Sequence, residues 1–196
     1  MLFRSEADWG GNFGVRKCDA TTIPPIITRG VLIDVARMRA QNEKAPLPSH
    51  YRIKKEDLEA ALKAQNTQIH PGDTVLIRTG VLQHWGENGK DHEVLRKYDS
   101  AGIDLDAAKW LVEQQGAALI GSDTSGLEWL PAPTEKGAWF FPVHRYLLTQ
   151  QGVHIGEFHF LEELSRDRVY EFCYMCMTNK IRGTTAGFTL RPIAMK

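Results

Sequence analysis

Stretches with the hydrophobic pattern of strands alternate along the chain with stretches that have the pattern of helices. A β-branched run predicts a strand at 30–36, a short apolar run predicts a buried strand at 117–123, and a turn leads into a predicted strand at 71–80. Apolar residues three and four positions apart predict helices over 54–66 and 103–116. Because strand–helix–strand units pair their strands in parallel, this alternation predicts an α/β domain.

The second half of the chain adds one helix and three strands to this pattern. Pro142 suits the first turn of a helix over 142–151, and the apolar stretch 153–160 is the next predicted strand. Residues 169–181 and 183–195 predict two long strands joined by a glycine-bounded turn. Since such a hairpin is antiparallel, the sheet is expected to be mixed.

The first 29 residues differ from the rest of the chain. They are rich in glycine, contain consecutive prolines and show no clear helix or strand pattern. A domain that opens with a long irregular stretch is unusual. No repeat or low-complexity linker divides the sequence, so a single domain over 1–196 is predicted.

The stretch FPVHRYLLTQQGVHIGEFHF carries the main candidates for chemistry. The predicted helix directs His144 toward the sheet, and strand alternation places Glu157 and His159 together on a face with β-branched residues. A buried carboxylate is normally paired, protonated or bound to a metal. Two interpretations remain open at this point: a structural Glu–His hydrogen bond, or a metal or catalytic site.

Two further candidates follow other predicted strands. Asp123, in GSDTSGLEWL, lies at the carboxyl edge of the sheet, where open α/β folds bind ligands, although an Asp there also commonly builds a turn. Arg78 ends another strand and has the geometry to hold a carboxylate with two hydrogen bonds, although a surface arginine is the commoner case.

Composition narrows the classes of partner and compartment. Lysine and arginine number 24 against 24 aspartates and glutamates, which argues against a broad surface for nucleic acid or anionic membrane. No apolar stretch has membrane-spanning length, and the start lacks the pattern of a secretory signal. Three cysteines suit a reducing compartment, and Cys173 and Cys176 would face opposite sides of a strand. We expect a cytoplasmic protein.

Several blocks of the sequence, in order, resemble one known family. These blocks include VLIDVA, HPGDTVLIRTG, DLDAAKWLVEQQGAALIGSDTSGLE, PVHRYLLTQQGVHIGEFHFLEEL and KIRGTTAGFTLRPIAM. They are similar to the cyclase family, which includes bacterial kynurenine formamidase and isatin hydrolase. The resemblance implies a swivelling β/β/α fold and metal-dependent hydrolysis of an amide, lactam or ester bond, with zinc or manganese acidifying the attacking water.

The resemblance also implies roles for individual residues. His144 and Glu157 match family positions that help hold the metal, so they are the implied catalytic and metal-binding residues. Asp123 and His159 would line the pocket, and Trp85 or Trp129 would stack on a small aromatic substrate.

One departure from the family is large. The principal metal motif, H-x-G-T-H-x-D-x-x-x-H, is absent, and Met1 stands about where that motif would just have ended. The chain therefore resembles the C-terminal two-thirds of a family member. Missing strands would expose sheet edge, so we expect a homo-oligomer. Two other functions remain open: a non-catalytic binding or assembly protein, and a metal-free enzyme using His144, Glu157 and Asp123 as acid and base.

Overall fold

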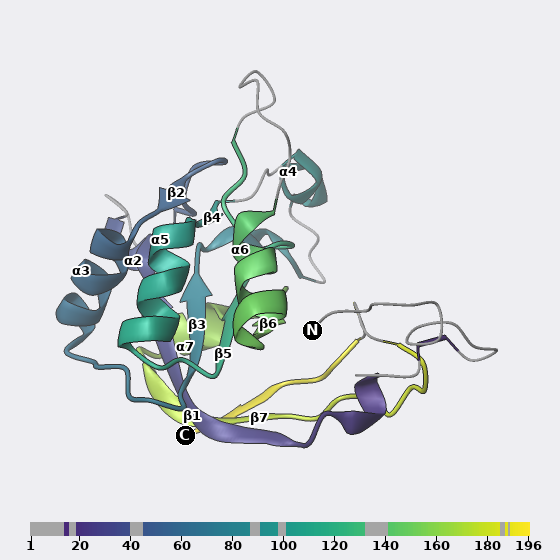
Figure 1. The fold of residues 1–196 in the computed structure, drawn as a ribbon. Coiled ribbons are helices and arrows are strands. Elements are labelled where there is room, and N and C mark those ends of the chain that lie inside the picture. Colours follow the sequence, from purple (N-terminus) through teal and green to yellow (C-terminus); the bar gives the residue numbers. More distant parts are fainter. Residues whose placement is uncertain are drawn as a thin grey trace.

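The structure is a computed structural model that describes residues 14–15, 19–39, 45–86, 91–97, 101–131, 141–184, 187 and 189–196. Its centre is a six-stranded sheet with the strand order β6-β5-β3-β1-β7-β8 (Figure 1). The strands are β1 (Ile26–Asp34), β3 (Thr74–Arg78), β5 (Leu119–Ser122), β6 (His154–Gly156), β7 (Glu171–Cys176) and β8 (Ile193–Met195).

The sheet is mixed, as the sequence predicts. Strands β1, β3, β5 and β6 pair in parallel, whereas β7 pairs antiparallel with both β1 and β8. A second, two-stranded parallel sheet joins β2 (Arg52–Ile53) to β4 (Gly102–Ile103). The predicted α/β class with a mixed sheet is confirmed.

Helices cover both faces of the large sheet, most of them on one side (Figure 1). That side carries α3, α5 and α6, and α7 lies on the other. The helical segments are η1 (Ala20–Thr22), α2 (Val35–Arg39), α3 (Lys55–Gln65), η2 (Val81–His84), α4 (His92–Lys97), α5 (Leu105–Lys109) with η3 (Trp110–Gln114), α6 (Pro142–His144) with η4 (Arg145–Gln151), and α7 (Glu162–Arg166).

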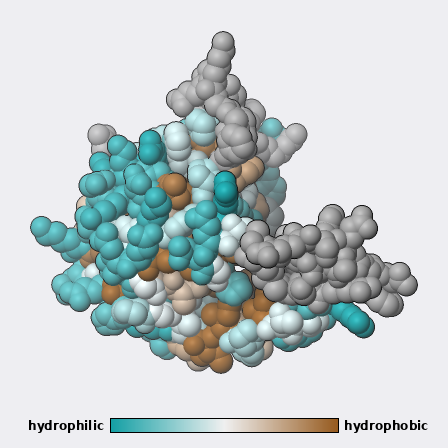
Figure 2. All heavy atoms as spheres, in the orientation of Figure 1, coloured by the Kyte–Doolittle hydropathy of each residue, from teal (hydrophilic) through white to brown (hydrophobic). Residues whose placement is uncertain are grey.

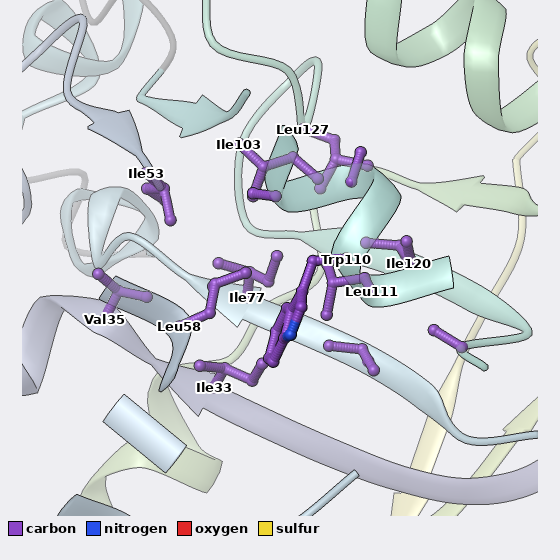
Figure 3. Packing of buried hydrophobic residues seen from close by; sticks show 14 of the residues in the cluster. Ile33, Val35, Ile53, Leu58, Ile77, Ile103, Trp110, Leu111, Ile120 and Leu127 are labelled. Atoms are coloured by element: carbon purple, nitrogen blue, oxygen red, sulfur yellow. The ribbon is translucent and has the colours of Figure 1, made fainter. Parts of the chain in front are cut away.

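Two apolar clusters hold these layers together. The larger one joins β1, β3 and β5 to the helices, and Ile33, Leu58, Ile77, Trp110 and Leu111 are among its members (Figure 3). The smaller cluster lies on the other face, where Leu32, Leu76, Phe172 and Tyr174 are among its members. The central strands are therefore buried on both faces, which explains their continuous apolar runs.

Some predicted strands have different limits in the structure. The first strand begins at Ile26, inside the stretch expected to be irregular, and changes to helix at Val35. The strand predicted over 153–160 ends at Gly156, because Phe158 adopts a left-handed backbone with φ 53°. The closing hairpin forms, but with the short strands β7 and β8, and a bridge joins Thr178 to Leu190 beyond them.

Strands β1, β7 and β8 extend away from the helix layer (Figure 1). Ile27, Met175 and Ile193 lie side by side across these three strands, and the side chains of Ile27 and Ile193 are exposed. Apolar atoms also gather at the surface over β1 and β7 in Figure 2. Both cysteines of β7 are free thiols, and Cys176 is buried whereas Cys173 is half-buried. Cys18 lies outside the described residues.

Candidate functional site

The structure brings His144 and Glu157 together. His144 ends α6, and Glu157 directly follows β6, the edge strand beside that helix. The Nε2 atom of His144 lies 3.5 Å from Oε1 of Glu157. Glu157 is 39% exposed, so it is not the buried carboxylate that strand alternation predicted.

The buried carboxylate at this site is Glu128, which is 2% exposed. Its Oε1 accepts a hydrogen bond from the Val143 backbone amide at 2.7 Å. Its Oε2 accepts one from the His144 backbone amide at 3.3 Å and one from His144 Nδ1 at 2.8 Å. Glu128 thus satisfies the first turn of α6 and holds the His144 ring at the same time.

Glu128 was not among the residues singled out from the sequence. One signal for it did exist: α6 begins with Pro142 after Phe141, whose side chain cannot accept a hydrogen bond from the first-turn amides. Those amides need an acceptor from elsewhere in the chain. The sequence does not show which acceptor reaches them, because residues 128 and 143 meet only in the folded structure.

Two carboxylates around one imidazole favour its charged form. Hydrogen bonding to Glu128, and then to Glu157, raises the pKa of His144 to about 9, although partial burial opposes the shift. At neutral pH, His144 is therefore a cation held between two anions. A metal ion at Nε2 would replace the proton on that nitrogen, so positive charge at this point is compatible with the surrounding groups.

Asp123 is fully buried, and both of its carboxylate oxygens are engaged. Oδ1 accepts hydrogen bonds from the Thr79 amide and hydroxyl, each at 2.8 Å, and Oδ2 accepts one from the Gly80 amide at 2.7 Å. Burial raises the pKa of Asp123 to about 6, while the bonds from Thr79 act in the opposite direction. These contacts fix the turn after β3, where Gly80 has φ 80°. A role toward a substrate stays a prediction.

The His159 ring packs against Tyr174, a member of the smaller apolar cluster, and no pairing of its side chain with the Glu157 carboxylate is present. Its Nε2 is 3.0 Å from the Tyr174 hydroxyl, and the ring packs against Gly121 and Gly156. The predicted pairing of Glu157 with His159 does not form, because the left-handed Phe158 between them breaks the strand alternation. Burial lowers the pKa of His159 to about 4, so the ring is neutral at pH 7. Pocket lining by His159 stays a prediction.

The two candidate tryptophans have protein partners. Trp85 is 61% exposed, and its ring stacks on His92 with 5.3 Å between the ring centroids. Trp129 donates from Nε1 to the His50 carbonyl at 2.8 Å, and the Arg52 guanidinium lies 5.0 Å from its ring centroid. Stacking on a substrate is not tested by this geometry, and it stays a prediction for both rings.

Arg78 does hold a carboxylate with two hydrogen bonds, and the protein itself supplies it. Arg78 Nε and Nη2 donate to the two oxygens of Glu162 at 3.0 and 2.7 Å, and Nη1 donates to Asp34 Oδ1 at 2.9 Å. The Ser165 hydroxyl donates to the other Asp34 oxygen. This buried network connects the ends of β1 and β3 to α7.

Metal-binding capacity within the described part of the chain is limited. No group of three or more His, Cys, Asp or Glu side chains is arranged there to hold a metal ion. His144 Nε2 and Glu157 fit as two donors, since imidazole nitrogen and carboxylate oxygen bind both zinc and manganese.

None of the helices in the described residues combines the length and the apolar character that a membrane span requires.

Comparisons with known proteins place this geometry in context. A family model described as "Putative cyclase" matches residues 7–129. No curated protein matches the chain. The crystal structure of a novel cyclase is similar at 34% identity and a TM-score of 0.69, over 86% of this chain and 53% of that one.

Two isatin hydrolase structures share the fold at lower identity. Isatin hydrolase A from Ralstonia solanacearum is 20% identical with a TM-score of 0.64, over 90% of this chain and 63% of that one. An isatin hydrolase bound to the product analogue thioisatinate is 21% identical with a TM-score of 0.61, over 86% and 60%. The chain thus spans between 53% and 63% of the length of these three proteins. His144 and Glu157 lie beyond the segment that the family model matches.

Proposed function

Because the chain belongs to the Putative cyclase family, we propose that it serves in the metal-dependent hydrolysis of a small, aromatic amide, lactam or lactone. The observation that carries this proposal is the approach of His144 Nε2 to Glu157 Oε1 at 3.5 Å, with Glu128 behind the ring. The shared fold of the isatin hydrolases supports the choice of a cyclic amide as a first substrate class.

In this proposal, His144 Nε2 and the Glu157 carboxylate bind a divalent cation, zinc or manganese. The cation would supply Lewis acidity and lower the pKa of a water molecule. Glu157 is the more exposed of the two carboxylates and lies where a cation arrives from solvent. A catalytic zinc site usually has three protein ligands, so further ligands must come from outside the described residues or from a second copy of the chain.

Trp129 and Trp85 are the proposed contacts to an aromatic substrate. Trp129 directly follows Glu128 in the chain, which keeps it closer to His144 along the sequence than Trp85. Trp85 is already stacked on His92. Three substrates should be compared. They are formylkynurenine, which is an aryl formamide, isatin, and a simple lactone.

Two variants of histidine test the metal site directly. Purified protein is equilibrated with zinc or manganese, freed of excess metal and analysed for metal content, as are the His144→Ala and His154→Ala variants. His154 is the matched control, because it is an exposed histidine on β6 close to Glu157. We expect stoichiometric metal in the parent and in His154→Ala, and loss of metal in His144→Ala. Parent protein without retained metal and without hydrolysis of any of the three substrates would refute the proposal.

The alternative is a family member that binds or assembles without catalysis. The observation in its favour is that the described residues contain no complete set of metal ligands. Its signature would be a folded protein that retains no metal and hydrolyses none of the substrates. A metal-free enzyme is less well supported, because both Asp123 oxygens are already bonded to Thr79 and Gly80.

A further inference from the structure

We infer that Glu128 is a positioning residue. It binds no cation itself, but it fixes the His144 ring so that Nε2 is the ring atom available to bind a cation. This inference rests on the proposed function, in which His144 is a metal ligand. It assigns a role to a residue that neither the sequence motifs nor the comparisons single out.

The position of Glu128 is fixed from two directions. Its Oε1 is bonded to the Val143 amide at 2.7 Å, and its Oε2 is bonded to the His144 amide at 3.3 Å. These are backbone groups at the start of a helix, so the carboxylate cannot rotate away without leaving both amides unpaired. The carboxylate is therefore a rigid acceptor for the third donor, His144 Nδ1.

This acceptor determines which ring nitrogen carries the proton in the neutral form. A carboxylate accepts hydrogen bonds only, so Nδ1 must be the protonated nitrogen, and the lone pair is then on Nε2. Nε2 faces Glu157. The Nδ1 hydrogen bond also limits rotation of the ring, which keeps Nε2 aimed at the same point.

Burial separates the roles of the two glutamates. Glu128 is 2% exposed and has three donors around it, whereas Glu157 is 39% exposed and has the His144 ring as its partner. A cation approaching from solvent meets Glu157 and Nε2 first. Glu128 lies on the opposite side of the imidazole and acts on the cation through the ring.

Glu128→Gln tests the positioning role because the two side chains have nearly the same shape. A glutamine has one acceptor oxygen for three donors: the Val143 amide, the His144 amide and His144 Nδ1. If its NH₂ faces Nδ1, that nitrogen must become an acceptor and the proton of the neutral ring moves to Nε2. If its oxygen faces Nδ1, a neutral amide accepts more weakly than a carboxylate, so the share of rings protonated at Nε2 still rises. We expect this tautomer change in ¹⁵N NMR spectra of metal-free protein, recorded above the pKa of His144.

The same variant should bind metal more weakly. We expect the dissociation constant for zinc, and for manganese, to rise about 10- to 100-fold when measured by competition with a chelator. Glu113→Gln is the matched control: Glu113 accepts from the Tyr146 hydroxyl at 2.7 Å and so holds the same helical segment without contacting His144. This control should lose stability without a change in metal affinity or tautomer.

The possible outcomes separate this inference from the proposed function. If the parent protein binds no metal, the proposed function fails, while the tautomer measurement still tests the positioning role. If the parent binds metal and Glu128→Gln binds it equally well with its Nδ1 proton retained, Glu128 is only a helix cap and the inference is overturned. Should Glu128→Gln not fold, the parent spectrum decides, because a neutral ring protonated at Nε2 also contradicts the inference.

Discussion

The Arg78 guanidinium and the Glu162 carboxylate form a pair of nearly parallel hydrogen bonds, at 3.0 Å from Nε and 2.7 Å from Nη2. Arg78 is 3% exposed and also donates to Asp34. One guanidinium therefore donates to two carboxylates at the point where β1 and β3 end and α7 begins.

Replacing Arg78 with methionine should be strongly destabilising. It removes the cation that pairs with Glu162, and it leaves the buried Asp34 with Arg37, whose Nε lies 3.5 Å from Asp34 Oδ2. We expect a loss of about 3–5 kcal/mol in the free energy of unfolding. Denaturant unfolding measures this loss. Arg166→Met is the control, because Arg166 pairs with Asp167 at an exposed position. If Arg78→Met lowers the free energy of unfolding no more than Arg166→Met does, the Arg78 network does not stabilise the fold.

His159 should make the protein less stable in acid. Its pKa is about 4 in the folded state against the ordinary histidine value of 6.5, so the unfolded chain binds more protons between these values. The stabilising contribution is complete above about pH 6.5 and is lost as the pH falls toward 4, by roughly 3 kcal/mol at most. Unfolding curves at several pH values should show a flatter profile for His159→Gln. His154→Gln, which changes an exposed histidine, should keep the parent profile; identical profiles for all three proteins would exclude His159 as the cause.

Asp123→Asn should destabilise the turn after β3. The three donors from Thr79 and Gly80 now meet an amide that has one acceptor oxygen and a donor NH₂ group, so at least one buried donor loses its partner. We expect a loss of about 2–3 kcal/mol in the free energy of unfolding. Asp106→Asn, at an exposed position in the first turn of α5, provides the comparison. Equal stability of the two variants would show that Asp123 does not hold this turn.

Features that depend on neighbouring residues were predictable from the sequence. The helix over Lys55–Gln65 ends at Asn66 with a left-handed backbone, and Asp104 caps the next long helix by accepting from the Ala107 amide. Gly116 has φ 71° at the end of that helix, as expected. Each of these features follows from local periodicity and from the hydrogen bonds that helix ends require.

Features that depend on tertiary contact were not predictable in the same way. Alternation suggested Glu157 as the buried carboxylate, yet Glu128 fills that role because folding brings it to the first turn of α6. Strand alternation also assumes an unbroken strand, whereas the left-handed backbone at Phe158 interrupts the extended chain. The predicted approach of His144 to Glu157 is present, the predicted pairing of Glu157 with His159 is not, and Glu128 was missed.

The left-handed backbone at Phe158 limits which sequence changes the segment from Gly156 to His159 can accept. Glu157 lies beside a histidine that keeps its proton at neutral pH, whereas His159, two positions later, is an uncharged ring bonded to Tyr174 of the smaller apolar cluster. Adding or removing one residue between Gly156 and His159 would send a carboxylate into the apolar cluster or the imidazole into solvent. We therefore expect this short connection to tolerate changes of side chain at Phe158, which is exposed, far better than any change of length.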